Sequence, residues 1–225
     1  MKKMYLFLSM VTVFALALSA CAPAAPVATE PPAPTAVPPT AVPPTATEAP
    51  PAVGSAEHPI KVLFVPSVDA NVIVTGGEVM AAALKEATGL NFEVVVPTSY
   101  AATIEEMCAS PTDTMAFIPA FGYVLANDLC GVDVAFKAVR RGWGVYWTMI
   151  VVARDSDIDS IDDLNGKKFA FPDAGSTSGY LVPSVMLKDA GVTVGEELEA
   201  GGHPQAVRAV YTGEADFAAA FYSPW

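Results

Sequence analysis

The stretch that decides the fold reads Phe169-Ala170-Phe171-Pro172-Asp173-Ala174-Gly175-Ser176-Thr177-Ser178-Gly179-Tyr180. A short apolar run ends at Phe171, and a hydroxyl run bracketed by glycines leads into a helix expected to begin near Gly179. The first N–H groups of a helix lack intrahelical partners and carry the positive end of the helix dipole. An oxyanion placed there can collect backbone N–H and side-chain O–H donors together, so the stretch predicts an anion-binding loop.

A simple helix cap is the alternative interpretation, because a single Ser or Thr before a helix usually does no more than cap it. Three consecutive hydroxyl residues exceed what one cap requires, and this favours ligand binding. The segment does not have the G-x-S-x-G order of a nucleophile elbow, because Thr177 occupies the central position. It also lacks the G-K-[ST] ending of a phosphate-binding P-loop.

The chain opens with the pattern of an export signal over residues 1–20. Two lysines precede a mostly apolar run, and small residues follow it. Leu18-Ser19-Ala20-Cys21 resembles a bacterial lipobox, so we expect cleavage before Cys21 and lipidation of its thiol. An uncleaved membrane anchor is the alternative, but the apolar run is short for one.

Residues 21–57 are predicted to be a tether that begins at the lipidated cysteine. From Ala22 onward the chain is almost wholly Pro, Ala, Thr and Val, with no periodicity that could bury a face. Proline fixes φ and removes backbone donors, so the segment should be an extended, semi-rigid spacer.

The other two cysteines and the net charge limit which kinds of functional site are expected. Cys108 and Cys130 follow an export signal, so we expect them to form a disulfide, with two free buried thiols as the alternative. No metal site is expected, because nearby histidines are lacking and a closed zinc site needs four ligands. The formal net charge of −12 argues against nucleic-acid binding.

Beyond the tether, short apolar runs alternate with amphipathic stretches, which predicts an α/β fold with a mostly parallel sheet. Residues 140–144 are expected to carry the chain from a first lobe, 58–145, to a second, 146–225. The second lobe is expected to be incomplete and the chain a fragment, because an apolar strand is followed almost directly by Trp225. The expected strands are 60–65, 92–96, 114–118, 134–139, 146–152, 168–171 and 215–221. A turn at 119–123 should lead into a short helix that ends at 126, and the other expected helices are 77–87, 101–108, 160–164, 179–191 and 203–211.

Three pieces carry a family resemblance: Thr98-Ser99-Tyr100-Ala101-Ala102, Ile118-Pro119-Ala120-Phe121-Gly122-Tyr123, and the run from Phe171 to Pro183. Residues 60–225 resemble the phosphate/phosphite/phosphonate-binding proteins of ABC importers. The resemblance implies a two-lobed α/β periplasmic-binding-protein (Venus flytrap) fold with mixed parallel sheets that closes on its ligand. The stretch 108–113 departs from the Gly-rich turn and Asp that many members carry, which leaves the identity of the ligand open.

The resemblance also implies a set of ligand-binding residues. The hydroxyl run would hold the anion's oxygens from the second lobe, two tyrosines would donate phenolic O–H bonds from the first, and a histidine would reach the same oxygens. A carboxylate would accept a bond from a protonated ligand oxygen. Taken one at a time, each of these residues has an ordinary structural alternative, as a helix cap, a half-buried aromatic or a surface residue. The set is Tyr100, Tyr123, Ser176, Thr177, Ser178, His203 and Asp216.

These observations favour a lipid-anchored, extracytoplasmic binding protein that captures a phosphonate, phosphite or phosphate for an ABC permease and needs no cofactor. The alternative keeps the binding fold but makes the protein a sensor of another small anion, such as a sulfonate or carboxylate. A hydrolase that uses Ser176 or Ser178 is a third hypothesis. It is disfavoured because the chain has only two histidines, His58 and His203, and no nucleophile elbow.

Overall fold

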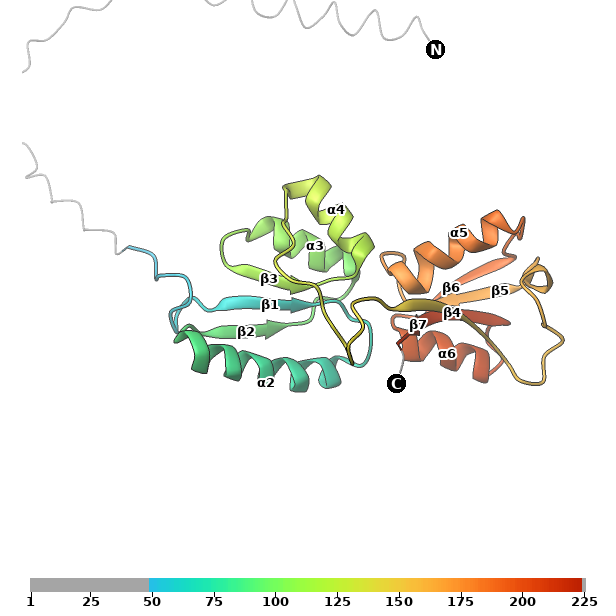
Figure 1. Ribbon diagram of the computed structural model, residues 1–225, viewed down its shortest axis with the longest axis horizontal. Helices are drawn as coiled ribbons and strands as arrows, with labels where there is room; N and C mark the ends of the chain where they lie inside the picture. The colour runs from blue at the N-terminus through green and yellow to red at the C-terminus, as the bar shows by residue number, and fades with distance from the viewer. Residues whose placement is uncertain (1–48, 224–225) are drawn as a thin grey trace, which may run out of the picture. The chain divides into compact units, whose positions relative to one another are not determined.

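The computed structural model describes residues 49–223 (Figure 1). The predicted export signal, the expected lipidation of Cys21 and most of the tether lie outside the described residues. None of the helices in the described range is long and apolar enough to cross a membrane.

The first sheet contains three parallel strands, β1 (Ile60–Phe64), β2 (Phe92–Val95) and β3 (Thr114–Phe117), in the order β2-β1-β3. Helix α2 (Ala70–Thr88) lies on one side of this sheet, and α3 (Tyr100–Ala109) and α4 (Ala120–Cys130) lie on the other (Figure 1). A Cβ atom at Gly77 of α2 would lie 2.7 Å from Val94 Cγ1, so the helix backbone approaches β2 closely there.

The second sheet contains β4 (Trp147–Val152), β5 (Lys168–Phe171), β6 (Glu196–Glu199) and β7 (Phe217–Tyr222). Its order is β4-β7-β5-β6, with β4 antiparallel to β7 and the other pairs parallel. A 3₁₀ turn (Asp162–Leu164) precedes β5, and a π-helical turn (Thr177–Leu181) leads from β5 into α5 (Val182–Asp189). Helix α6 (His203–Tyr211) connects β6 to β7.

The two faces of β5 bury different side chains because successive residues of a strand alternate. Phe169 and Phe171 pack on the α5 side in one hydrophobic cluster, where the Phe169 and Phe217 rings stack at 4.9 Å. Ala170 faces the other way and packs with small residues of α6 in a second cluster. Figure 1 shows α5 and α6 on opposite sides of this sheet.

The predicted strand over residues 134–139 is wrong. Val134, Phe136 and Val139 are exposed, Phe136 to 91%. Their apolar side chains suit a strand, but a strand also needs a neighbouring strand with which its backbone can pair. Within residues 131–146, which run from the first sheet to the second, the structure describes one bridge, between Arg140 and Trp143.

Two further differences concern an edge strand and a helix start. β6 was not predicted, because Glu196-Glu197-Leu198-Glu199 is mostly acidic. It is an edge strand, where charged residues are common, and Glu196 forms an ion pair with Lys168 at 2.9 Å.

Helix α2 begins at Ala70, seven residues before the predicted Gly77. The Asp69 carboxylate accepts a bond from Asn71 N and caps the helix there.

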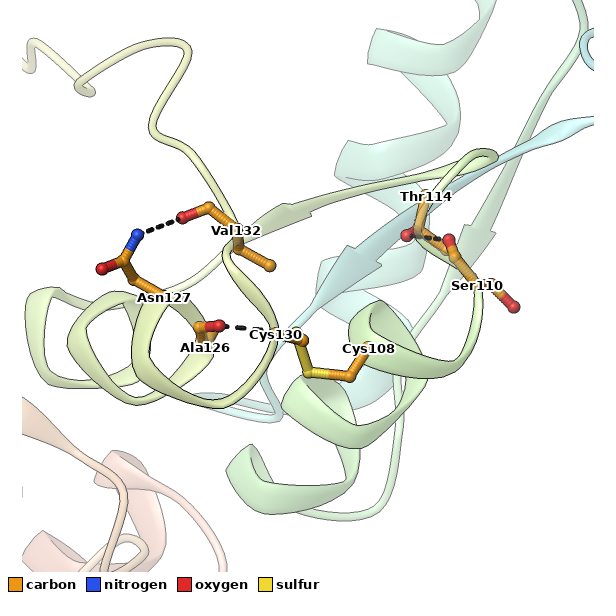
Figure 2. The surroundings of a disulfide bond; sticks show 7 residues. All are labelled: Cys108, Ser110, Thr114, Ala126, Asn127, Cys130 and Val132. Atoms are coloured by element: carbon orange, nitrogen blue, oxygen red, sulfur yellow. Dashed lines mark hydrogen bonds between the residues drawn. A yellow bond between two sulfur atoms is a disulfide. The ribbon is translucent and has the colours of Figure 1, made fainter.

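The predicted disulfide is present. Cys108 in the last turn of α3 is bonded to Cys130 at the end of α4, with their Cα atoms 5.6 Å apart (Figure 2). The chain leaves α4 through Gly131, and the Asn127 side chain donates to Val132 O just beyond it (Figure 2). The bond therefore ties together the carboxyl ends of the two helices that cover one side of the first sheet.

Candidate ligand-binding site

The candidate site is built from loops at the carboxyl ends of parallel strands. In the first sheet, Tyr100 opens the helix after β2, and Phe121 lies in the first turn of the helix after β3. In the second sheet, the hydroxyl run follows β5 and His203 opens the helix after β6. Ligands of open α/β sheets bind outside the carboxyl ends of the strands, so the topology alone directs attention to these loops.

The hydroxyl run enters a π-helical turn. Ser176 Oγ accepts a bond from Gly179 N at 3.1 Å, and Leu181 N donates to Ser176 O at 3.0 Å. Ser176 is therefore a helix N-cap, as the simpler interpretation of the sequence expected. Its side chain and that of Ser178 are buried. Single π-helical turns are rare and occur frequently at functional sites.

Ser176 is also the centre of a polar cluster that joins the two sheets' loops. The Tyr100 phenol lies close enough to Ser176 to affect the pKa of the phenol, and His203 Nε2 lies 3.4 Å from Ser176 Oγ. Burial raises the pKa of Tyr100 to about 12 and lowers the pKa of His203 to about 4. Both side chains are therefore neutral near pH 7, and the cluster offers uncharged hydrogen-bonding groups.

One ring nitrogen of His203 has no hydrogen-bond partner within residues 49–223. The residue is 5% exposed, and its ring meets that of Phe221 edge-on at 5.0 Å. Nδ1 is buried and makes no hydrogen bond to any described residue. Buried polar atoms are nearly always paired, so this atom is a position where a ligand could supply the missing partner.

Thr177 is directed toward the first sheet's helices. Its Oγ1 accepts a bond from Phe121 N at 2.9 Å, in the first turn of α4, where the N-cap residue Pro119 supplies no side-chain cap. Tyr123 lies half-buried in the same helix. Among the described residues, no hydrogen bond connects the Tyr123 phenol with Ser176, Thr177 or His203. The structure thus brings Tyr100 and His203 to the hydroxyl run at Ser176, with Tyr123 on the neighbouring helix.

Asp216 does not lie at this site, so its expected role as a ligand-binding carboxylate is corrected. It is exposed, and its Oδ2 accepts a bond from Lys168 N at 2.7 Å, at the amino end of β5. β7 runs parallel to β5, so a residue just before β7 lies at the end of the sheet opposite the hydroxyl run. Four residues of strand separate the two ends by about 13 Å.

Asp173 is a buried residue of the site that the sequence reasoning did not single out. It is 9% exposed, and its Oδ1 accepts a bond from Gly175 N at 2.7 Å while its Oδ2 accepts one from Tyr100 N at 3.1 Å. An Asp two residues before a Gly is the pattern of an Asx turn, and that local part of its role was readable in the sequence.

The donor set suits an anion better than a cation. It consists of hydroxyls, a phenol, an imidazole and backbone N–H groups at helix starts, all of which can donate to an oxyanion. In the part of the chain that the structure describes, no group of three or more His, Cys, Asp and Glu side chains is arranged to hold a metal ion.

Residues 62–225 match the sequence model of the family described as ABC transporter, phosphonate, periplasmic substrate-binding protein. The chain is 32% identical over 152 residues to the phosphate-import protein PhnD of Mycolicibacterium smegmatis, a match that covers 61% of this chain and 47% of that protein. It therefore spans about half the length of this curated relative.

Two solved structures have the same fold. A binding protein component of an ABC phosphonate transporter from Pseudomonas aeruginosa superposes with a TM-score of 0.62 at 21% identity, covering 72% of this chain and 56% of that one. PhnD1 of Prochlorococcus marinus, solved in complex with methylphosphonate, superposes with a TM-score of 0.63 at 21% sequence identity. The match covers 71% of this chain and 62% of that one. These likenesses confirm the expected two-lobed α/β fold. Because the family model matches most of its length, this chain belongs to the periplasmic substrate-binding proteins of phosphonate ABC transporters.

Proposed function

We propose that this protein captures a small phosphorus oxyanion, a phosphonate or the related phosphite or phosphate, and delivers it to an ABC permease. The observation that carries the proposal is the neutral cluster of Tyr100, Ser176 and His203, in which the buried His203 Nδ1 has no partner among the described residues. The relatives support the same class of ligand, since one is an importer of phosphate and another was solved with methylphosphonate.

Neutral donors suit such a ligand on this acidic chain. The net charge of −12 gives no long-range attraction for an anion, so capture rests on local hydrogen bonds and helix dipoles. A tetrahedral phosphonate presents several acceptor oxygens that can be divided among hydroxyl, phenol and backbone N–H donors. Such donors bind the anion without a buried countercharge.

The capping contacts leave the hydroxyl groups able to bind a ligand. A hydroxyl has one O–H donor and two acceptor lone pairs. Ser176 and Thr177 accept bonds from Gly179 N and Phe121 N. Thr177 retains its own proton for a ligand oxygen, and the Ser176 proton can go to a ligand oxygen or to His203 Nε2. We therefore propose that three second-lobe residues donate hydrogen bonds to the ligand: Ser176, Thr177 and Ser178. Further donors are Tyr100, Tyr123 and His203.

Lipid anchoring outside the cytoplasm completes the proposal. The lipobox-like sequence before Cys21 supports cleavage and lipidation there, with residues 22–57 as the tether and lobes at 58–145 and 146–225. The Cys108–Cys130 disulfide supports an oxidising compartment. Catalysis is not proposed, since no nucleophile elbow accompanies the hydroxyl run.

Calorimetric titration of the full chain with methylphosphonate tests the function, and Tyr100→Phe tests the cluster. Removing the phenol oxygen leaves a charged ligand oxygen short of a donor, so we expect affinity to fall by about 1.5–3 kcal/mol, roughly 10- to 100-fold. Tyr180→Phe is the matched control, because its hydroxyl contacts Glu197 at the surface, and it should bind like the wild type.

Two outcomes would contradict the proposal. Equal losses of methylphosphonate affinity in the two tyrosine variants would show that the cluster around Tyr100 is not part of the binding site. Tighter binding of methanesulfonate or acetate than of methylphosphonate, phosphite or phosphate would favour the alternative, a sensor of another small anion. Methanesulfonate is the sharper probe, because it shares the tetrahedral shape of methylphosphonate and differs mainly in charge and protonation.

A further inference from the structure

Three backbone N–H groups donate hydrogen bonds from one lobe to the other. Each of the three bonds connects a loop of the first sheet to a loop of the second, across 56 to 136 residues of sequence. The bonds are Tyr100 N to Asp173 Oδ2 at 3.1 Å, Phe121 N to Thr177 Oγ1 at 2.9 Å, and His203 N to Ser67 O at 3.0 Å.

Asp173 supplies the one charged acceptor among these three bonds. A hydrogen bond to an ionised acceptor is roughly twice as strong as a neutral one. The carboxylate lies at the start of α3, where the positive end of the helix dipole favours a negative charge. Its second oxygen is held by Gly175 N, so the carboxylate is fixed before it meets Tyr100.

Tyr100 meets the same loop at two points. Asp173 accepts a bond from its backbone N–H, and Ser176 lies next to its phenol. The loop comes this close because residue 175 has no side chain: a Cβ atom there would lie 2.8 Å from Tyr100 Cβ. The contact between the lobes therefore also sets the direction in which the phenol points.

We propose that Asp173 is a positioning residue that holds the two lobes closed and thereby sets ligand affinity without contacting the ligand. Its carboxylate favours the closed arrangement, in which Tyr100, Ser176 and His203 form one cluster. Loss of the carboxylate shifts the population toward open lobes, so ligand binding must supply more of the free energy of closure. The affinity part of this inference rests on the proposed function, whereas the closure part does not.

Amide hydrogen exchange in the ligand-free full chain, followed by NMR, tests closure directly. If Asp173 holds the lobes, Asp173→Asn should accelerate exchange at Tyr100, Phe121 and His203 together by about tenfold, the size expected for losing one bond to a charged group. Asp163→Asn is the matched control. Asp163 also accepts two backbone bonds, from Asp159 N and Ser160 N, but entirely within the second lobe, and the three inter-lobe amides should keep their wild-type rates.

Acceleration at Tyr100 alone would overturn the proposal, because it would make Asp173 a local cap of α3. If the Asn variant does not fold, Gly175→Ala separates the same two surfaces through its Cβ atom, and unchanged exchange at Phe121 and His203 in that variant would equally overturn it. In the same samples, methylphosphonate should bind the Asn variant about tenfold more weakly, and saturation should restore protection. Failure of the wild type to bind methylphosphonate would refute the proposed function and leave the ligand-free exchange result to decide closure.

Discussion

Ser176 Oγ accepts a bond from Gly179 N and also lies 3.4 Å from His203 Nε2, so one hydroxyl is both a helix cap and part of the polar cluster. The two interpretations of the hydroxyl run are therefore compatible, since capping uses the oxygen's lone pair and leaves its proton for another acceptor. The buried imidazole of His203 is expected to respond to pH, because burial lowers its pKa from 6.5 to about 4.

The pH dependence of stability follows from His203. Its pKa is lowered from 6.5 to about 4 in the folded protein, so between these values the unfolded chain binds more protons than the folded one. Stability should therefore fall as the pH decreases through this window, by on the order of 3 kcal/mol at its lower end. His203→Gln should flatten this fall. Urea unfolding of both proteins at a series of pH values measures it, and parallel curves would show that the imidazole does not cause the slope.

At the scale of elements, helix α2 shows how close packing can override local preference. The helix was predicted to start at Gly77, yet Gly77 and its neighbour Gly76 both lie inside it. A Cβ atom at Gly76 would meet nothing within 4 Å, whereas one at Gly77 would lie 2.7 Å from Val94 Cγ1 and 3.1 Å from Phe64 Cε2. The second glycine is therefore required by the sheet beneath it, and the first is not.

The two glycines form a matched pair for a stability measurement. Gly76→Ala should raise the free energy of unfolding by about 0.5–1 kcal/mol, because alanine loses less backbone entropy in a helix. Gly77→Ala should lower it by about 1–3 kcal/mol, because the added methyl group overpacks the contact with β2. Chemical denaturation of the two variants decides the matter. The same sign for both changes would mean that α2 does not pack on β2 in the described way.

At the scale of the whole molecule, each part serves a different step of the proposed transport role. The two sheets each present the carboxyl ends of parallel strands to the site, the disulfide fixes α3 against α4, and Asp173 bridges the lobes. The proposed lipid at Cys21 would keep this receptor at the membrane through a proline-rich spacer. Anchoring and ligand binding should then be separable.

Cys21→Ser tests that separation. Without the thiol no lipid can be attached, so the protein should move from the membrane fraction to the soluble fraction while its methylphosphonate affinity stays unchanged. Ser19→Ala, which keeps the cysteine, is the control and should remain with the membrane. Cell fractionation combined with intact mass measures both. A Cys21→Ser protein that stays in the membrane at full mass would indicate instead that the apolar run of residues 4–18 is an uncleaved anchor.

The sequence by itself determined the alternation of strands and helices, the disulfide partners and the position of the hydroxyl run, because these depend on local periodicity, on compartment and on a contiguous motif. It did not determine which segments find a strand partner, and so residues 134–139 were expected as a strand and the acidic β6 was not. Only the tertiary structure decided that Asp216 lies at the far end of β5, since this depends on the direction in which β7 pairs. It also decided that Asp173 meets Tyr100 across 73 residues, because a contact between two folded lobes leaves no periodic trace in either segment.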